Sequence, residues 1–211
     1  MIDIGVNFHS SQLKGLAAEL LSRAAAAGVT HILATGTSLH ASELALSFAR
    51  AHERVWATAG THPHDAKHWD AASTAQFEAM WADAHVVAVG ECGLDYNRMF
   101  SPREAQRIAF EAQIAAAVRT GKPLFLHCRD AFDDFEAMLR DALRVIPADR
   151  LHLETDAPYL RPKNAGKTRN YNEPALLPFV AKAVAELKGM DVAALSAQAT
   201  ANSRRLFKLP D

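Results

Sequence analysis

Short apolar runs alternate with amphipathic stretches of helical period along this 211-residue chain. This alternation predicts parallel strands joined by helical crossovers, because parallel neighbours need long connections. The chain should therefore fold as an α/β protein, and we expect one domain over residues 1–211. The expected strands are 2–8, 31–36, 55–59, 86–90, 124–127 and 151–155.

Composition and charge limit the classes of protein to which this chain can belong. Apolar residues make up 49% and charged residues 22%, which is ordinary for a globular protein, and no apolar run is long enough to span a membrane. The first eight residues lack the basic region of a signal peptide, so we expect a cytoplasmic protein without disulfides. The net charge of −1 provides no general attraction for nucleic acid, so phosphate-binding charge must be concentrated in an enzyme cleft.

Polar residues gather where the predicted strands end. The clusters are 60–65 (GTHPHD), 90–95 (GECGLD), 127–130 (HCRD) and 154–159 (ETDAPY). In a (β/α) barrel the carboxyl ends of the strands carry the active site. The sequence therefore predicts a catalytic site assembled from several strand ends.

Side-chain alternation along a strand selects the candidate metal ligands. Glu91 continues the row of Val87 and Val89, His127 continues that of Phe125, and Asp156 ends a third strand. Two carboxylates and one imidazole suit Mg²⁺, Mn²⁺ or Zn²⁺.

The same alternation turns Cys92 and Cys128 toward the helix layer, as small packing residues. His62 and His64 flank a proline on a strand-end loop, where either could meet a phosphate or transfer a proton. His31, His40, His52, His68 and His85 are interpreted as structural or solvated.

These segments together resemble the TatD-related deoxyribonucleases. The runs GTHPHD, GECGLD, LHCRDA (126–131), ETDAPYL (154–160) and NEP (172–174) occur in the family's order over nearly the whole chain. The resemblance implies a metal-dependent hydrolase on a TIM-type (β/α) barrel that trims DNA from the 3′ end. It implies metal ligands at Glu91, His127 and Asp156, and a substrate-pocket role for His62.

Two departures from the family pattern affect this expectation. The first strand reads DIGVN (3–7), which resembles one branch of the family and lacks the two histidines of many relatives. Between His127 and the ETDAPYL strand, two strands and one metal-binding histidine are missing. We therefore expect an incomplete or open barrel of about six of eight strands, whose exposed edges could pair into a homo-oligomer. His152 lies too far before Asp156 along the strand to replace the lost ligand.

The leading hypothesis is a divalent-metal phosphodiesterase acting on DNA, with single-stranded ends as its substrate. Glu91, Asp156 and His62 would be catalytic, and phosphate would be received by His62, His64, Arg129, Arg161 and Lys163. A basic rim of Arg161, Lys163, Lys167 and Arg169 should attract the backbone. Two rivals stay open: a metal-dependent amide or ester hydrolase such as an aminoacyl-tRNA deacylase, and a catalytically impaired shortened relative that acts as a binding protein.

Overall fold

The structure is a computed structural model that describes residues 1–131, 134–135, 138, 152–159, 162, 165, 171–188 and 190–210. Its internal contacts divide the chain into two compact units. Unit 1 comprises residues 1–34, 48–56 and 150–211, and unit 2 comprises 35–47 and 57–149. A single domain over the whole chain stays a prediction.

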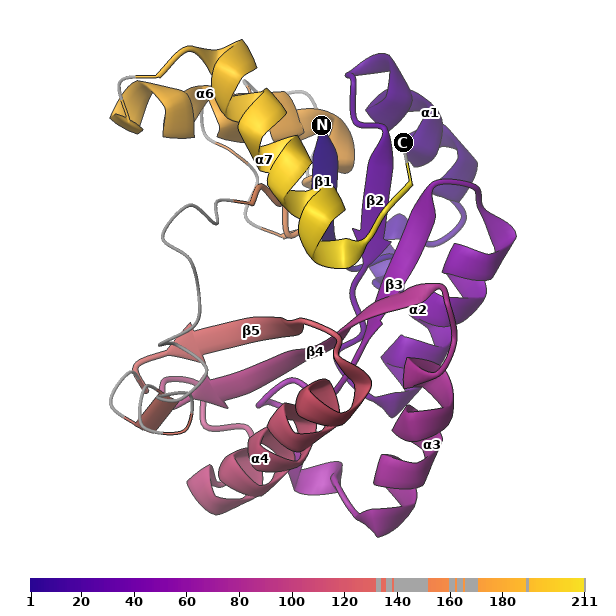
Figure 1. The fold of residues 1–211 in the computed structure, drawn as a ribbon, viewed down its shortest axis with the longest axis vertical. Coiled ribbons are helices and arrows are strands. Elements are labelled where there is room, and N and C mark those ends of the chain that lie inside the picture. Colours follow the sequence, from indigo (N-terminus) through magenta and orange to yellow (C-terminus); the bar gives the residue numbers. More distant parts are fainter. Residues whose placement is uncertain are drawn as a thin grey trace. The chain divides into compact units, whose positions relative to one another are not determined.

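The predicted α/β class with a parallel sheet is confirmed (Figure 1). Five strands are assigned among the described residues, in the order β1-β2-β3-β4-β5, and the printed pairings are parallel. This is an incomplete TIM-type arrangement, since a closed barrel has eight strands. The strands are β1 (Ile2–Val6), β2 (His31–Ala34), β3 (Val55–Ala59), β4 (Val86–Asp95) and β5 (Leu124–Arg129).

Unit 1 packs its helices beside β1 and β2 around one apolar core. The core contains the fully buried side chains of Val6, Leu20 and Leu177, with Leu195 from the last helix. Asp191 caps that helix by accepting a hydrogen bond from the Ala194 amide. The helical elements are η1 (Ser11–Leu13), α1 (Ala17–Ala26), η4 (Pro174–Leu176), α6 (Leu177–Lys188) and α7 (Val192–Phe207).

The predicted sixth strand lies beside β1 without being assigned as a strand over its described residues. The Ile4 amide donates to the Leu153 carbonyl, the Asp156 amide donates to Gly5, and Val6 and Ala157 form a parallel bridge. This segment therefore extends the parallel arrangement of unit 1. Residue 151, its expected first residue, lies outside the described residues.

Unit 2 is built on the parallel pair β4 and β5, with α4 (Arg103–Thr120) packed against β4. Asp70 caps α3 (Ala71–Trp81) by accepting from the Ser73 amide. The Trp81 indole donates to the Ala59 carbonyl and so ties α3 to the end of β3. The remaining helical elements are η2 (Ala66–His68) and α2 (Leu39–Ala51), and α2 begins in unit 2 and ends in unit 1.

β4 is longer than the sequence predicted, because it continues through the glycine-rich 90–95 segment. Gly93 adopts φ +141°, and a Cβ atom at this position would collide with the His127 carbonyl of β5. Glycine is therefore required for the two strands to approach each other here. The consequence is that Glu91 and Asp95 both belong to β4 itself.

Two further expectations have outcomes in the fold. Cys92 is buried as predicted, but the packing role of Cys128 is wrong: this side chain is exposed on β5, which is the last strand of the sheet among the described residues, and α4 packs against β4. Within the described residues, no helix is both long and apolar enough to cross a membrane.

Candidate metal centre

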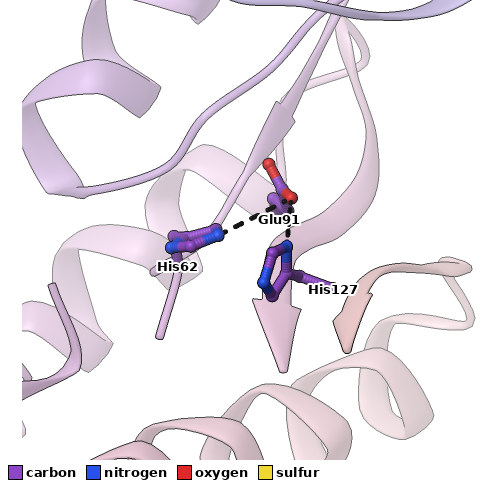
Figure 2. Close-up of side chains that lie close together, drawn as sticks. All are labelled: His62, Glu91 and His127. Atoms are coloured by element: carbon purple, nitrogen blue, oxygen red, sulfur yellow. Dashed lines mark ion pairs between the residues drawn. The ribbon is translucent and has the colours of Figure 1, made fainter. Parts of the chain in front are cut away.

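Three side chains of unit 2 meet toward the carboxyl ends of successive strands (Figure 2). His62 follows β3, Glu91 lies in β4, and His127 lies in β5. One potential ligand atom from each lies within 4.8 Å of the others. All three side chains are between 11% and 19% exposed, so an ion could reach them from solvent. Two imidazoles and one carboxylate form a set that suits a divalent transition metal.

Backbone hydrogen bonds hold this arrangement. The Glu91 amide donates to the Gly36 carbonyl at 2.8 Å, and the His62 amide donates to the Thr37 carbonyl at 2.8 Å. The side-chain amide of Gln113, from α4, accepts from the Thr61 amide at 2.8 Å and donates to the Thr61 carbonyl at 3.1 Å. The loop after β3 is therefore fixed by a buried side chain rather than by a longer strand.

Asp95 links the histidines to one another. Its Oδ2 atom lies 2.8 Å from His64 Nε2, 3.2 Å from His127 Nε2 and 3.6 Å from Arg129 Nη1. Its Oδ1 atom accepts from the amides of Asn97 and Arg98, at 3.0 and 2.9 Å. A fully buried carboxylate is tolerated here because both of its oxygens have hydrogen-bond partners.

The charges of the cluster are mutually dependent. Burial opposes ionisation of Asp95, but hydrogen bonds from the Arg98 amide and His64 outweigh it, so its pKa lies well below the usual value. Burial likewise opposes the charge on Glu91, yet the neighbouring His127 and His62 lower its pKa. His127 is desolvated too, but Glu91 and Asp95, one at each ring nitrogen, raise its pKa. The two carboxylates that flank His127 therefore favour its protonated form.

His62 behaves in the opposite way. Burial, together with repulsion from His127 and His64, lowers its pKa to about 4 although Glu91 is close. Its Nδ1 atom accepts a hydrogen bond from the His64 amide at 3.1 Å. A neutral ring that accepts at Nδ1 carries its proton on Nε2. His62 therefore presents an N–H donor toward Glu91, whose Oε1 lies 3.8 Å away.

The structure brings Glu91 and His127 together, whereas Asp156 belongs to unit 1. There its Oδ1 atom accepts from Asn7 Nδ2 at 3.1 Å, and its backbone takes the left-handed conformation, φ +58°. The role of Asp156 as a metal ligand stays a prediction. Arg161 and Lys163, with the rest of the expected basic rim at Lys167 and Arg169, lie outside the described residues.

Three residues that sequence reasoning missed organise these groups. Asp95 has the same strand parity as Glu91, so the alternation argument would have found it if the strand had been extended by five residues. Asn7 and the buried Asp3 fix the segment before Asp156: Asp3 accepts from the Thr155 hydroxyl at 2.6 Å and from the Thr155 amide at 3.1 Å. Burial raises the pKa of Asp3 to about 7 despite these hydrogen bonds.

The family profile and two similar proteins identify the same family. The profile of the "TatD related DNase" family matches residues 2–142 and 136–208. A "3'-5' ssDNA/RNA exonuclease TatD" from Cronobacter sakazakii is 42% identical, covering 98% of this chain and 97% of that protein. A protein of the same name from Enterobacter lignolyticus is 39% identical, with 98% of both chains covered.

Solved structures agree on the fold. A TatD homologue from Escherichia coli superposes with a TM-score of 0.87 at 24% identity, covering 100% of this chain and 98% of that chain. An uncharacterised amidohydrolase from Saccharomyces cerevisiae superposes with a TM-score of 0.82 at 20% identity, covering 98% and 99%.

The matches also locate the missing segment. The Cronobacter alignment extends over 257 positions, whereas this chain has 211 residues, so the relative contains residues without a counterpart here. The two profile matches meet at 136–142, between His127 and the ETDAPYL segment, where the sequence predicts the loss. The order of the motifs, the cluster at the ends of β3, β4 and β5, and the profile match agree: this chain belongs to the TatD-related DNase family.

Proposed function

We propose that this protein is a divalent-metal-dependent hydrolase that removes nucleotides from the 3′ end of single-stranded DNA. The observation that carries the proposal is the convergence of His62, Glu91 and His127 within 4.8 Å. The family and the names of its relatives support phosphodiesters as substrate.

Glu91 and His127 would hold the ion, and Asp156 is proposed to join them. Because Asp95 accepts from His127 Nε2, the other ring nitrogen, Nδ1, faces Glu91 Oε1 at 3.4 Å. A carboxylate behind a ligating imidazole fixes its tautomer and strengthens it as a ligand. Asp95 is thus a positioning residue for His127. The bound ion would supply Lewis-acid polarisation of the phosphate and activation of water.

His62 has a different role in this proposal. The His64 amide donates to His62 Nδ1, so the ring proton of His62 lies on Nε2. The low pKa of His62 keeps its ring neutral at physiological pH. It can therefore donate a hydrogen bond to a phosphate oxygen. Arg129, whose side chain is 45% exposed beside Asp95, is suited to a second phosphate contact.

A labelled single-stranded oligonucleotide tests the function. With the label at the 5′ end, metal-stripped protein should be inert, and added Mg²⁺, Mn²⁺ or Zn²⁺ should produce a ladder that shortens from full length. Immediate release of labelled mononucleotide would indicate the opposite polarity. An aminoacyl-tRNA substrate assayed in parallel separates the ester-hydrolase alternative, since both activities would share the metal.

Substitutions test which side chains are needed for metal-dependent cleavage. Glu91→Gln and His127→Ala should abolish metal-dependent cleavage, whereas His40→Ala, at an exposed histidine paired only loosely with Glu43, should leave it unchanged. His62→Gln retains an N–H donor and should keep more activity than His62→Ala. Full activity of Glu91→Gln, or cleavage that needs no metal, would refute the proposal. A cytoplasmic location stays a prediction.

A further inference from the structure

The loop between β4 and α4 carries an apolar tip next to the metal cluster. Phe100 is 55% exposed and its neighbour Met99 is 43% exposed. The Phe100 ring lies edge-on to His64, with centroids 4.8 Å apart, and the His64 ring in turn lies 4.3 Å from that of His62. A single ring, that of His64, therefore lies between Phe100 and His62, the side chain proposed to donate a hydrogen bond to phosphate.

The loop that presents Phe100 is anchored on both sides. At its start, Asp95 accepts from the Asn97 and Arg98 amides. At its end, the buried Ser101 hydroxyl donates to the His64 carbonyl at 2.8 Å, and Gln106 Nε2 donates to the Ser101 carbonyl at 2.9 Å. The loop is therefore held by hydrogen bonds on both sides of Phe100, while more than half of this residue stays exposed to solvent.

Tyr96, at the other end of this loop, is used differently. Its hydroxyl donates to Asp134 at 2.7 Å, and the Arg103 guanidinium lies 4.2 Å above its ring. Both its polar and its aromatic capacities are thus used within the protein. Phe100 contacts the His64 ring in an edge-type arrangement and has more than half its surface open to a ligand.

Two cationic side chains lie near this loop. Lys67 Nζ donates to the Phe100 carbonyl at 3.2 Å, and Arg129 lies beside Asp95. A single strand of nucleic acid needs cations along its backbone and aromatic faces for its bases. Phe100, Lys67 and Arg129 offer both within one unit of the protein, around the same three-residue cluster.

We propose that Phe100 stacks on an unpaired base of the strand whose phosphodiester lies at His62, Glu91 and His127. This inference rests on the proposed nuclease function and specifies how that site selects its substrate. Stacking on a ring accepts any base, because every base has an aromatic face. A base in a duplex has neighbours on its faces, so the contact selects single-stranded ends without reading their sequence.

The test combines protein and substrate variants. Phe100→Ala should raise KM for a single-stranded oligonucleotide roughly 5- to 150-fold, the range for loss of one base–aromatic stack, with a smaller change in kcat. Phe100→Trp should retain or improve binding, and Phe100→Leu should behave like Phe100→Ala. Val118→Ala is the matched control, since Val118 is 79% exposed on α4 away from this loop.

Oligonucleotides with an abasic site at each of the last three positions provide the decisive arm. At one position, removing the base should impair the native protein as Phe100→Ala does, and Phe100→Ala should lose nothing further. Equal sensitivity of native and Phe100→Ala protein to every abasic site would overturn the inference, as would full function of Phe100→Leu. Perturbation of His64 by the substitution cannot reproduce this pattern, because it would affect intact and abasic strands alike.

A binding measurement under conditions that allow no cleavage tests the stacking contact separately from the proposed nuclease function. If the native protein cleaves no nucleic acid, the nuclease proposal fails, but fluorescence anisotropy with the same oligonucleotides in metal-free buffer still reports stacking. Weaker binding of Phe100→Ala to the intact strand alone would support the contact. Identical binding of both proteins to intact and abasic strands would refute it.

Discussion

Replacing Asp95 by Asn tests whether the tautomer of His127 is set by this carboxylate. The exchange preserves the shape of the side chain and leaves an oxygen that can accept from the Asn97 and Arg98 amides. The other terminal atom becomes an NH₂ donor, which would face the Nε2–H groups of His64 and His127 at about the present 2.8 and 3.2 Å separations. Two donors repel, so His127 should carry no proton on Nε2 and one on Nδ1, the atom that faces Glu91.

The magnitude follows from the loss of that ligand position. Removing a group behind a metal-ligating histidine costs about 10- to 100-fold in metal affinity, or roughly 1.4–2.7 kcal/mol. Asp95→Asn should reach at least the upper part of this range, because it both removes the support and blocks the ligand atom. Isothermal titration with Mn²⁺ and Zn²⁺ measures the affinity, and ¹⁵N spectra of the imidazoles report the tautomer.

A matched control is available in the same unit. Asp70 accepts from the Ser73 amide and hydroxyl at the start of α3, away from the cluster, and Asn is also a good N-cap. Asp70→Asn should therefore leave metal affinity unchanged. Unaltered affinity in Asp95→Asn, or an Nε2-protonated His127 in that variant, would refute the reasoning.

Three further predictions concern pH, strand packing and the sheet edge. Metal binding must displace the proton of His127, whose pKa is raised, while Glu91 with its lowered pKa is already ionised. The metal affinity measured by titration should therefore rise with pH, with the slope expected for release of one proton, until the pH passes the folded pKa of His127, and then level off. The stability that His127 contributes to the protein without metal should be lost over the same rise in pH. Gly93→Ala should cost about 2–5 kcal/mol in unfolding experiments because its Cβ collides with the β5 backbone, whereas Gly121→Ala, at φ +65° in open space, should cost only about 1 kcal/mol. If β5 pairs with a second copy, sedimentation should show concentration-dependent association that Leu126→Lys abolishes, since Leu126 is 37% exposed on the last strand of the sheet; a monomer at all concentrations would contradict this.

The sequence predicted that Glu91 and His127 lie together but not that Asp95 contacts His127. Alternation along two parallel strands was sufficient to place Glu91 and His127 at one end of the sheet, because strand parity and parallel register are properties of the backbone. The same argument stopped at Gly90, where the density of glycines suggested a loop. Gly93 instead marks the place where β4 lies closest to β5, which only the packed strands reveal.

Other parts of the site depend on contacts that no local pattern encodes. The donor role of His62 follows from one amide, that of His64, pointing at Nδ1. The exposure of Cys128 follows from which strand α4 covers. In unit 1, Asn7 and Asp156 are 149 positions apart in sequence, and no alternation rule connects them.

The missing segment removes less of the site than its length suggests. The two profile matches meet at 136–142, after β5, so the loss follows every residue that builds the cluster of unit 2. His62, Glu91, Asp95 and His127 are positioned by residues between Gly36 and Gln113, through hydrogen bonds to the backbone and to Asp95. Such a site can form from the contiguous strands β3, β4 and β5 even when the barrel is not completed. The sequence predicts that the missing segment includes one metal-binding histidine, and the residues of β5 are half-buried or exposed. We therefore expect a site that keeps its geometry but binds metal at least on the order of 10²-fold more weakly than a full-length relative, because a ligand that is absent altogether should cost at least as much as lost support behind one.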